Sequence, residues 1–580
     1  MSSSVTVVTT RNPVYGLEDE RGGGECSSEG GGVTPTTKRE LWSWYLYDWA
    51  NSVYFTVAIG GFLPLQLLRL TQLQWCSTRI PASAELHALC DEDHLPGFDD
   101  AYVRVGALSI RPDSAATYFI SLSVLTQAFT FIALGPLADF GALRYKLLVS
   151  FGVSGAIATS SLFFVWAPSL WWLAGMGIVV SNTCIGASII FYNAYLPLLV
   201  EGHEDVIAAK RNDAVVTKDD EASTPSTTAT TKMTSVEEVR ELVTNRISST
   251  GFLLGFVSGV LLICFCAGLA LSGVLSAESV AGDTLVYRFS NLVTGIWWLV
   301  FGIISYSGIK CRPALARLPK SFRVVATLGF KCSWKTLTTS FRALPNSFLM
   351  LVGWFFYSDG INTLASVGSI FAASELDMTG AELSLILAEV PLFAALGSYL
   401  FQKLYERTKW TPKSMIQLIL KLFLPLPLYT IAGFLPFLPF GMKHKWEMYV
   451  FGAWYGLLLG PVQSFSRSMY MDLIPKNQEA RFFSLYEITD KGSSWIGPLL
   501  AGLIANLGTM RYAMLVVLMN VLIGYFFLRR VDHTAGRRQA QAATDSGIAT
   551  HSNGEVRVPG DRDLLIAEAD KELEMGTIAL

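Results

Sequence analysis

The chain has 580 residues, of which 51% are hydrophobic and 16% are charged, and its mean hydropathy is +0.40. Soluble domains carry charge on about a quarter of their residues, so a soluble enzyme and a disordered scaffold are both disfavoured. The net charge of -3 leaves no basic excess for binding nucleic acid phosphates. Because hydrolase, metalloprotease and phosphate-binding motifs are all missing, we expect no enzyme activity, no cofactor and no metal site.

Residues 1–41 form a polar tail that lacks the apolar core of a signal peptide, and we expect it to be disordered. Twelve stretches then follow that are long and apolar enough to cross a bilayer, which requires about 20 residues. Their approximate bounds are 42–70, 114–138, 146–166, 169–198, 246–271, 289–309, 346–373, 380–402, 413–437, 446–471, 482–507 and 510–529. The pattern predicts an all-α membrane protein.

A basic linker, residues 310–345, divides the spans into halves at 42–309 and 346–529. The linker holds eight Lys and Arg residues and no acid, whereas the first loop, 71–113, is acidic. Because basic loops remain in the cytoplasm, this bias places both termini on the cytoplasmic side. The polar insert 201–245 is expected to be a disordered cytoplasmic loop. Residues 530–580 form a cytoplasmic tail.

The two halves share a short motif in corresponding spans. Asp48, Asn51 and Ser52 in the first span match Asp359, Asn362 and Thr363 in the seventh, and both read D-x-x-N-[ST]. Residues at i, i+3 and i+4 share one helix face, so each half offers a carboxylate, an amide and a hydroxyl together. The match suggests a parallel internal repeat, which is common in transporters.

Charged and polar side chains inside predicted spans are costly, and they usually face a bundle interior or a water-filled cavity. The candidates are Asp48, Tyr192, Asn193, Asp359, Glu389, Gln463, Arg467, Glu487, Asp490 and Lys491. Structural roles remain open for several of them. The intramembrane cluster Glu487, Asp490 and Lys491 includes an i, i+4 pair that could bind internally, and Arg467 could reach water near a helix end.

The second span ends in G-x-L-A-D-x-G-x-x-R-x-K, where the charged positions are Asp139, Arg144 and Lys146. We interpret this segment as a gating latch at the cytoplasmic edge, with Asp139 capping or pairing at a neighbouring helix end. It is similar to the loop motif of the major facilitator superfamily. The corresponding position of the second half is Phe401, so gating is expected to be asymmetric.

Two further short patterns lie outside the spans. Cys76 and Cys90 share the acidic loop, and either a disulfide or two free thiols fits their position. The pattern D-x-x-x-L-[LI] at Asp561, Leu565 and Ile566 resembles an acidic dileucine signal, which sorting adaptors read in exposed tails.

Several longer motifs resemble the Atg22 family of vacuolar transporters. The segments are 44–52, 191–197, 247–251, 357–360, 460–475 and 482–498. The resemblance implies a major facilitator fold in the vacuolar membrane and export of amino acids released by autophagy, which supports survival during nitrogen starvation. It supplies no agreed substrate-binding residues.

In a major facilitator fold the spans numbered 1, 4, 7 and 10 line the central cavity, which gives a set of substrate-binding candidates. They are Asp48, Asn51, Tyr192, Asn193, Asp359, Asn362, Gln463 and Arg467. A carboxylate suits the ammonium of an amino acid and Arg467 suits its carboxylate. Asp359 and Glu389 are candidates for proton coupling. Facilitated diffusion, another small solute as cargo, and a non-transporting sensor or lipid-handling role all remain open, as does the oligomeric state.

Overall fold

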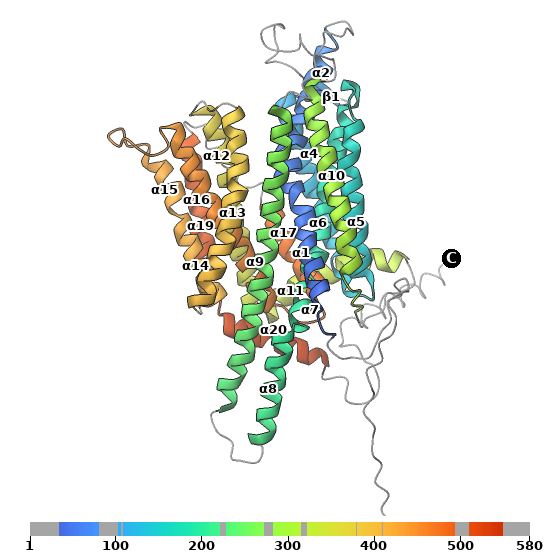
Figure 1. Cartoon of the computed structure of the whole chain (residues 1–580), viewed down its shortest axis with the longest axis vertical. Coiled ribbons are helices and arrows are strands. Elements are labelled where there is room, and N and C mark those ends of the chain that lie inside the picture. Colours follow the sequence, from blue (N-terminus) through green and yellow to red (C-terminus); the bar gives the residue numbers. More distant parts are fainter. Residues whose placement is uncertain are drawn as a thin grey trace, which may run out of the picture.

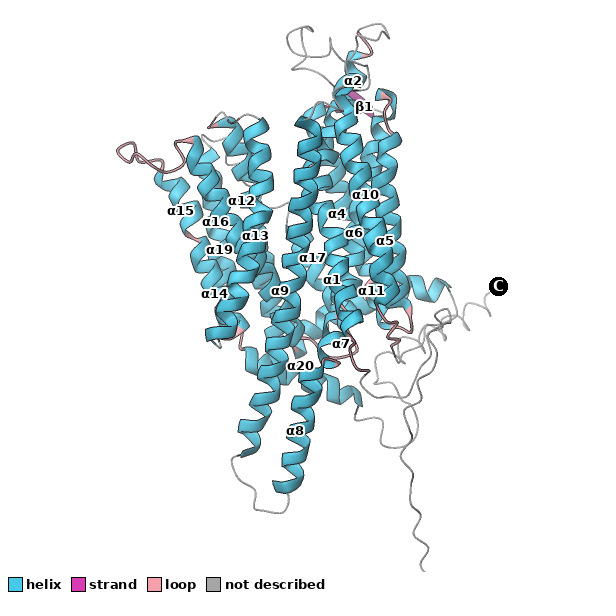
Figure 2. Ribbon diagram, in the orientation of Figure 1, coloured by secondary structure: helices cyan, strands magenta, loops and turns pink. Residues whose placement is uncertain are grey.

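The computed structural model describes residues 34–79, 102–105, 108–220, 228–271, 282–314, 322–376, 378, 380–408, 410–493 and 510–548. Long helices dominate it, and they stand side by side in two groups (Figures 1 and 2). The N-terminal group is α1–η1–α2 (Lys38–Val53, Tyr54–Phe62, Leu63–Cys76), α4 (Pro112–Leu134), α5 (Leu143–Ser161), α6 (Trp171–Asn193), α9 (Thr228–Leu271) and α10 (Gly282–Gly308).

The C-terminal group is α12 (Pro345–Ser374), α13 (Gly380–Thr408), α14 (Pro412–Phe423), α15 (Pro425–Ala432), α16 (Lys445–Asp472), α17 (Glu479–Ser493) and α19 (Ala513–Arg530). Nine helical segments of the described chain are long and apolar enough to cross a membrane. Prolines start α12 and α14, where a missing N–H costs nothing, and the Thr411 hydroxyl caps α14. These lengths agree with the predicted all-α membrane class.

Short elements connect the long helices. They are β1 (Val103–Val105), β2 (Leu108–Ile110), η3 (Pro136–Asp139), η4 (Leu162–Phe164), η5 (Pro168–Leu170), α7 (Leu196–Glu201), α8 (Glu204–Asp220), α11 (Phe322–Ala343), η6 (Met510–Tyr512) and α20 (His533–Ile548). β1 and β2 pair antiparallel, with Val103 opposite Ile110. The hairpin marks one end of the molecule, and α8 and α20 mark the other (Figure 1). We call these the hairpin end and the α20 end.

The prediction that the insert 201–245 is a disordered loop is wrong for its described residues. α8 and the first part of α9 are helical, and they pack against each other below the bundle (Figure 1). Residues 236–243, which read VEEVRELV, are good helix formers, and lengthening an existing helix costs little. Glu201 binds Arg240 at 3.1 Å, which ties α9 to the end of α7.

α20 in the C-terminal tail connects the two halves. Asp532 caps it by accepting the Ala535 N–H, and such bonds hold the pKa of this exposed carboxyl below its ordinary value. Arg537 pairs with Glu237 of α9 and with Asp472 of α16 at 3.3 Å each. These contacts join the N-terminal and C-terminal groups at the α20 end.

Cys76 is disulfide-bonded. Its predicted partner, Cys90, lies outside the described residues, as does the dileucine pattern. Cys311 in the basic linker is also disulfide-bonded, which its isolated position did not indicate.

The halves meet along two helices. α9 packs against α13 and α16, and α17 packs against α4 and α6. A fold in which two groups touch through so few helices leaves room for a cavity between them.

Candidate functional site

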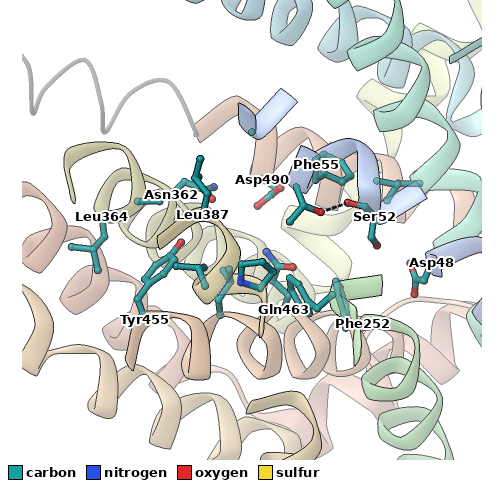
Figure 3. Close-up of a pocket in the computed structure, with 18 of the residues that line it drawn as sticks. Asp48, Ser52, Phe55, Phe252, Asn362, Leu364, Leu387, Tyr455, Gln463 and Asp490 are labelled. Atoms are coloured by element: carbon teal, nitrogen blue, oxygen red, sulfur yellow. Dashed lines mark hydrogen bonds between the residues drawn. The ribbon is translucent and has the colours of Figure 1, made fainter. Parts of the chain in front are cut away.

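A cavity of about 440 Å³ lies between the two halves. Figure 3 shows Asp48 and Phe252 at one end of it and Leu364 and Tyr455 at the other. Its volume lies in the range of small-molecule sites. Its walls are mostly aromatic and aliphatic, and its charged groups gather at the end nearer α20.

Most of the predicted polar residues line this cavity. They are Asp48, Asn51, Tyr192, Asn193, Asn362, Gln463, Arg467, Glu487, Asp490 and Lys491. The lining therefore combines three acidic and two basic side chains in one space. Those that the sequence placed on spans 1, 4, 7 and 10 come from α1, α6, α12 and α16.

Asp359, which we predicted to bind substrate, is not among the residues that line the cavity. Its carboxylate accepts a hydrogen bond from Asn520 of α19, on the far side of α12. Glu389 also lies outside the lining and stands beside Gly452 of α16. Neither of the two candidates for proton coupling, Asp359 and Glu389, is among the lining residues in this conformation.

Asp48 is held at the cavity floor by an aromatic frame. The Tyr192 hydroxyl donates to its carboxylate at 2.6 Å, and Tyr192 stacks on Trp44 with centroids 4.3 Å apart. Gly251 of α9 allows this arrangement, because a Cβ there would lie 2.3 Å from the Asp48 carboxylate. Gly255 and Gly259 meet Ser52 and Thr56 in the same way one and two turns further along.

Arg467 connects three helices at the cavity floor. Its Nε and Nη2 donate to the hydroxyl and carbonyl oxygens of Ser248 at 3.0 Å each, and its Nη1 donates to the Asn193 amide oxygen at 3.1 Å. The guanidinium also lies 4.0 Å from the Asp48 carboxylate and 4.3 Å from the Phe252 ring centroid. A fixed, 97% buried cation of this kind presents one oriented positive charge to the cavity.

The cluster on α17 divides into two separate contacts. Glu487 accepts a hydrogen bond from the Asn193 amide at 3.1 Å, across the boundary between the halves. Lys491 pairs with Asp490 at 2.9 Å, and Asp490 also accepts from the Ser358 hydroxyl. Lys491 thus shares its charge with Asp490 and is not committed to Glu487 alone.

α1 changes its winding where it borders the cavity. Residues Tyr54–Phe62 form a π-helix that begins two residues after Ser52 and contains the Gly60–Gly61 pair. π-helical turns occur often at functional sites. Phe55, Thr56 and Gly60 of this π-helical segment line the cavity.

The motif at the end of α4 closes the molecule at the α20 end. Asp139 is fully buried and accepts the backbone N–H groups of Ala480 and Arg481 at 3.0 and 3.1 Å, so it caps α17. Arg144 donates to Asp139 at 3.2 Å and to Glu479 at 3.0 Å. We call Asp139, Arg144 and Glu479 the inter-half latch, since α17 belongs to the other half.

Lys146 takes no part in this latch: its side chain is exposed on the outer face of α5. The equivalent edge of the second half is weaker. Phe401 is buried there, and the nearby cross-half ion pair joins Arg246 to Glu406 at 3.4 Å, with half of the arginine side chain exposed.

A family model described as "Vacuole effluxer Atg22 like" matches residues 36–541. The chain belongs to the Atg22 family. It is 30% identical to autophagy-related protein 22 of Coccidioides immitis, covering 91% of this chain and 94% of that one. It is 31% identical to autophagy-related protein 22-1 of Penicillium rubens, covering 88% and 93%.

Solved structures of major facilitator transporters share the fold. The human organic anion transporter MFSD10 superposes with a TM-score of 0.53 at 12% identity, over 85% of this chain and 99% of that one. The proton:xylose symporter XylE gives 0.53 at 12% identity, over 87% and 99%. Family and fold together establish a multi-pass transporter of the vacuolar membrane rather than an enzyme.

Several residues of the site escaped prediction. Trp44 and Ser248 lie in the family-like motifs, but neither carries a charge that marks it as functional. Glu479 precedes a predicted span and looks like an ordinary loop acid. Their partners come from other helices, which residue spacing along one helix does not reveal.

Proposed function

We propose that this Atg22-family transporter carries amino acids from the vacuolar lumen to the cytosol by alternating access. The observation that carries the proposal is the cavity floor, where Asp48, Arg467 and Glu487 place opposite charges within one small space. An amino acid bears an ammonium and a carboxylate on one carbon, so it needs both signs close together. A sugar needs neither, and an organic anion needs only cations.

In this proposal the carboxylates of Asp48 and Glu487 receive the substrate ammonium, and Arg467 receives its carboxylate. The amides of Asn51, Asn362 and Gln463 are positioned along the cavity to contact either group. The Asn51 amide nitrogen is buried and has no hydrogen-bond partner within the described residues, which suits a donor to substrate. Leu364, Leu387, Phe252, Phe256 and Tyr455 supply an apolar wall for the substrate side chain.

The unequal closure of the two ends supports alternating access. The cavity lining extends from Arg467 to Gly60, Gly368 and Met448, which lie nearer the hairpin end of their helices. The inter-half latch closes the α20 end. The basic linker, together with the positive-inside rule, supports a cytoplasmic location for the α20 end and both termini. The present conformation is then open toward the lumen.

Transport also requires an energy source, and there are two candidates for it. A proton moving from an acidic lumen supplies about 1.4 kcal/mol per pH unit, while facilitated diffusion uses the amino-acid gradient alone. Of the three lining carboxylates, Asp490 is paired with Lys491, so Asp48 and Glu487 are the better candidates to exchange a proton with the cavity. Replacing Glu487 by Gln tests this: transport that no longer responds to a pH gradient supports coupling.

The test of the cargo is uptake by the full-length protein in liposomes, with labelled leucine, lysine and glutamate compared. The proposal expects saturable uptake of at least one amino acid, lost in Asp48→Asn. Uptake of a sugar or an organic anion, without uptake of any amino acid, would show that this other solute is the cargo. No uptake of any solute, with or without a pH gradient, would favour a sensor or lipid-handling protein. Recognition of the 561–566 pattern by sorting adaptors stays a prediction.

A further inference from the structure

A second, larger hollow lies on the outer side of the bundle. Its volume is about 640 Å³, and it is formed by α11, α12, α17 and the end of α4. Its lining is Ile132, Phe330, Ser333, Trp334, Leu337, Phe348, Leu351, Val352, Phe355, Phe356, Leu485, Ile488 and Thr489. We call it the α11 groove. It is separate from the transport cavity, since the two share no lining residue.

The α11 groove offers a ligand very little polar surface and no charged side chain in its lining. Its two hydroxyls are both engaged: Ser333 donates to the Ile132 carbonyl and Thr489 to the Tyr486 carbonyl, at 2.8 Å each. Everything else in the lining is aliphatic or aromatic. The groove therefore suits a hydrocarbon chain and excludes the zwitterion proposed for the transport cavity.

α11 is attached to the bundle on one face only. Its Gly329 lies against the backbone of α4, where a Cβ would meet the Ala133 carbonyl at 1.8 Å, and Leu328 and Cys332 pack with Leu137 and Phe140. The opposite face is apolar yet exposed. Trp334 is 70% exposed and Phe341 63%. In a membrane protein such a face lies against lipid.

The charges on α11 indicate which class of lipid binds beside it. The helix carries Arg323, Lys331, Lys335 and Arg342 and no acidic residue. Lys331, Lys335 and Arg342 are spaced by four and seven residues, so they form a stripe beside the aromatic stripe of Phe330, Trp334 and Phe341. An amphipathic helix with this pairing of basic and aromatic stripes lies in the interface plane of a bilayer and attracts anionic headgroups.

We propose that the α11 groove binds an anionic glycerophospholipid, with one acyl chain in the groove and the phosphate beside Lys331 and Lys335. The bound lipid contacts the back of two helices that form the transport cavity. Leu485 and Ile488 face the groove while Tyr486 and Glu487 of the same helix face the cavity. The lipid would support the position of α17, whose first turn is held by the inter-half latch.

The experiment uses the full-length protein in detergent, with phosphatidylserine or phosphatidylcholine added in matched amounts, and measures bound lipid by native mass spectrometry and the melting temperature. We expect phosphatidylserine to be retained preferentially and to raise the melting temperature. Lys331→Gln with Lys335→Gln should remove that preference. The control is the double variant Lys403→Gln with Arg407→Gln, which removes two basic charges from the α20 end of α13. This control should keep the preference for phosphatidylserine.

Ile488→Trp tests the apolar half of the site, because the larger ring fills the groove and should reduce retention of both lipids. Photo-crosslinking of a diazirine-labelled phosphatidylserine to the wild-type protein needs no variant, and it should label the helices that form the groove, which are α11, α12, α17 and the end of α4. Three results would overturn the proposal: equal retention of the two lipids, equal loss in the Lys403/Arg407 control, or labelling confined to other helices. If the protein instead forms a dimer that covers α11 and excludes lipid, the groove is a contact with a second copy of the chain.

Discussion

Asp48 and Asp359 occupy the same position of the same motif in the two halves, yet their surroundings differ. Asp48 faces the cavity, where Tyr192 binds it and Arg467 stands 4.0 Å away. Asp359 faces α19 and binds Asn520. Both are buried, and only one is placed to meet a substrate.

A rotation of one helix relative to the other explains the difference. On α12 the residue that reaches the cavity cluster is Ser358, which binds Asp490, and Asp359 is one position further on. One residue is a rotation of about 100° on an α-helix. Asn362, three residues after Asp359, nevertheless lines the cavity. The halves are thus related by a repeat in sequence but present different chemistry to the cavity.

Removing Arg467 should have the largest effect, because Arg467→Ala takes away the cation between the halves and leaves Asp48 buried without it. We expect uptake in liposomes to fall by about 100-fold or more. Arg467→Lys keeps the charge but not the planar fork that binds Ser248 and Asn193, so it should restore only a small part. Wild-type uptake by Arg467→Ala at normal protein levels would remove Arg467 from the site, and wild-type uptake by Arg467→Lys would show that the charge alone is sufficient.

Crowding the back of Asp48 should have the next largest effect. A methyl group in Gly251→Ala would overlap the Asp48 carboxylate and displace it, and overpacking of this kind also costs about 1–3 kcal/mol of folding stability. We expect uptake to fall by roughly 5- to 100-fold, which corresponds to about 1–3 kcal/mol of lost substrate binding. Gly268→Ala on the same helix is the control, since a Cβ there meets nothing within 4 Å. Equal losses in both variants would show that the reduced flexibility of α9, and not the contact with the carboxylate, is responsible.

A smaller effect is expected from the closure at the α20 end. Asp139→Asn weakens the cap of α17 and should shift the population toward the cytosol-open state by about tenfold. Glu406→Gln breaks the exposed Arg246–Glu406 pair, and it should shift the population of the cytosol-open state by less than about fivefold. Spin labels at Lys146→Cys and Asn477→Cys, with the free cysteines replaced, report the separation of the halves. A larger shift for Glu406→Gln would reverse the proposed asymmetry.

The sequence was sufficient to predict the helical membrane class, because the apolar spans are long and the charges lie mostly between them. It also identified Asp48, Asn193 and Arg467, because a polar group in a span is costly and needs a partner. It did not predict which face of α12 turns inward, since packing against α19 decides that. Nor did it predict α8 and the long α9, because a Thr-rich insert hides the helix-forming residues 236–243.

The most direct test of the account is equilibrium binding of a labelled amino acid that the wild-type protein transports, compared between Asp48→Asn and Asp359→Asn. Each change removes one buried carboxylate from the same motif and keeps the shape of the side chain. The account predicts that Asp48→Asn loses binding by about 100-fold, while Asp359→Asn, still able to bind Asn520, stays within about threefold of wild type. Equal losses in the two variants, or unchanged binding in Asp48→Asn, would contradict it.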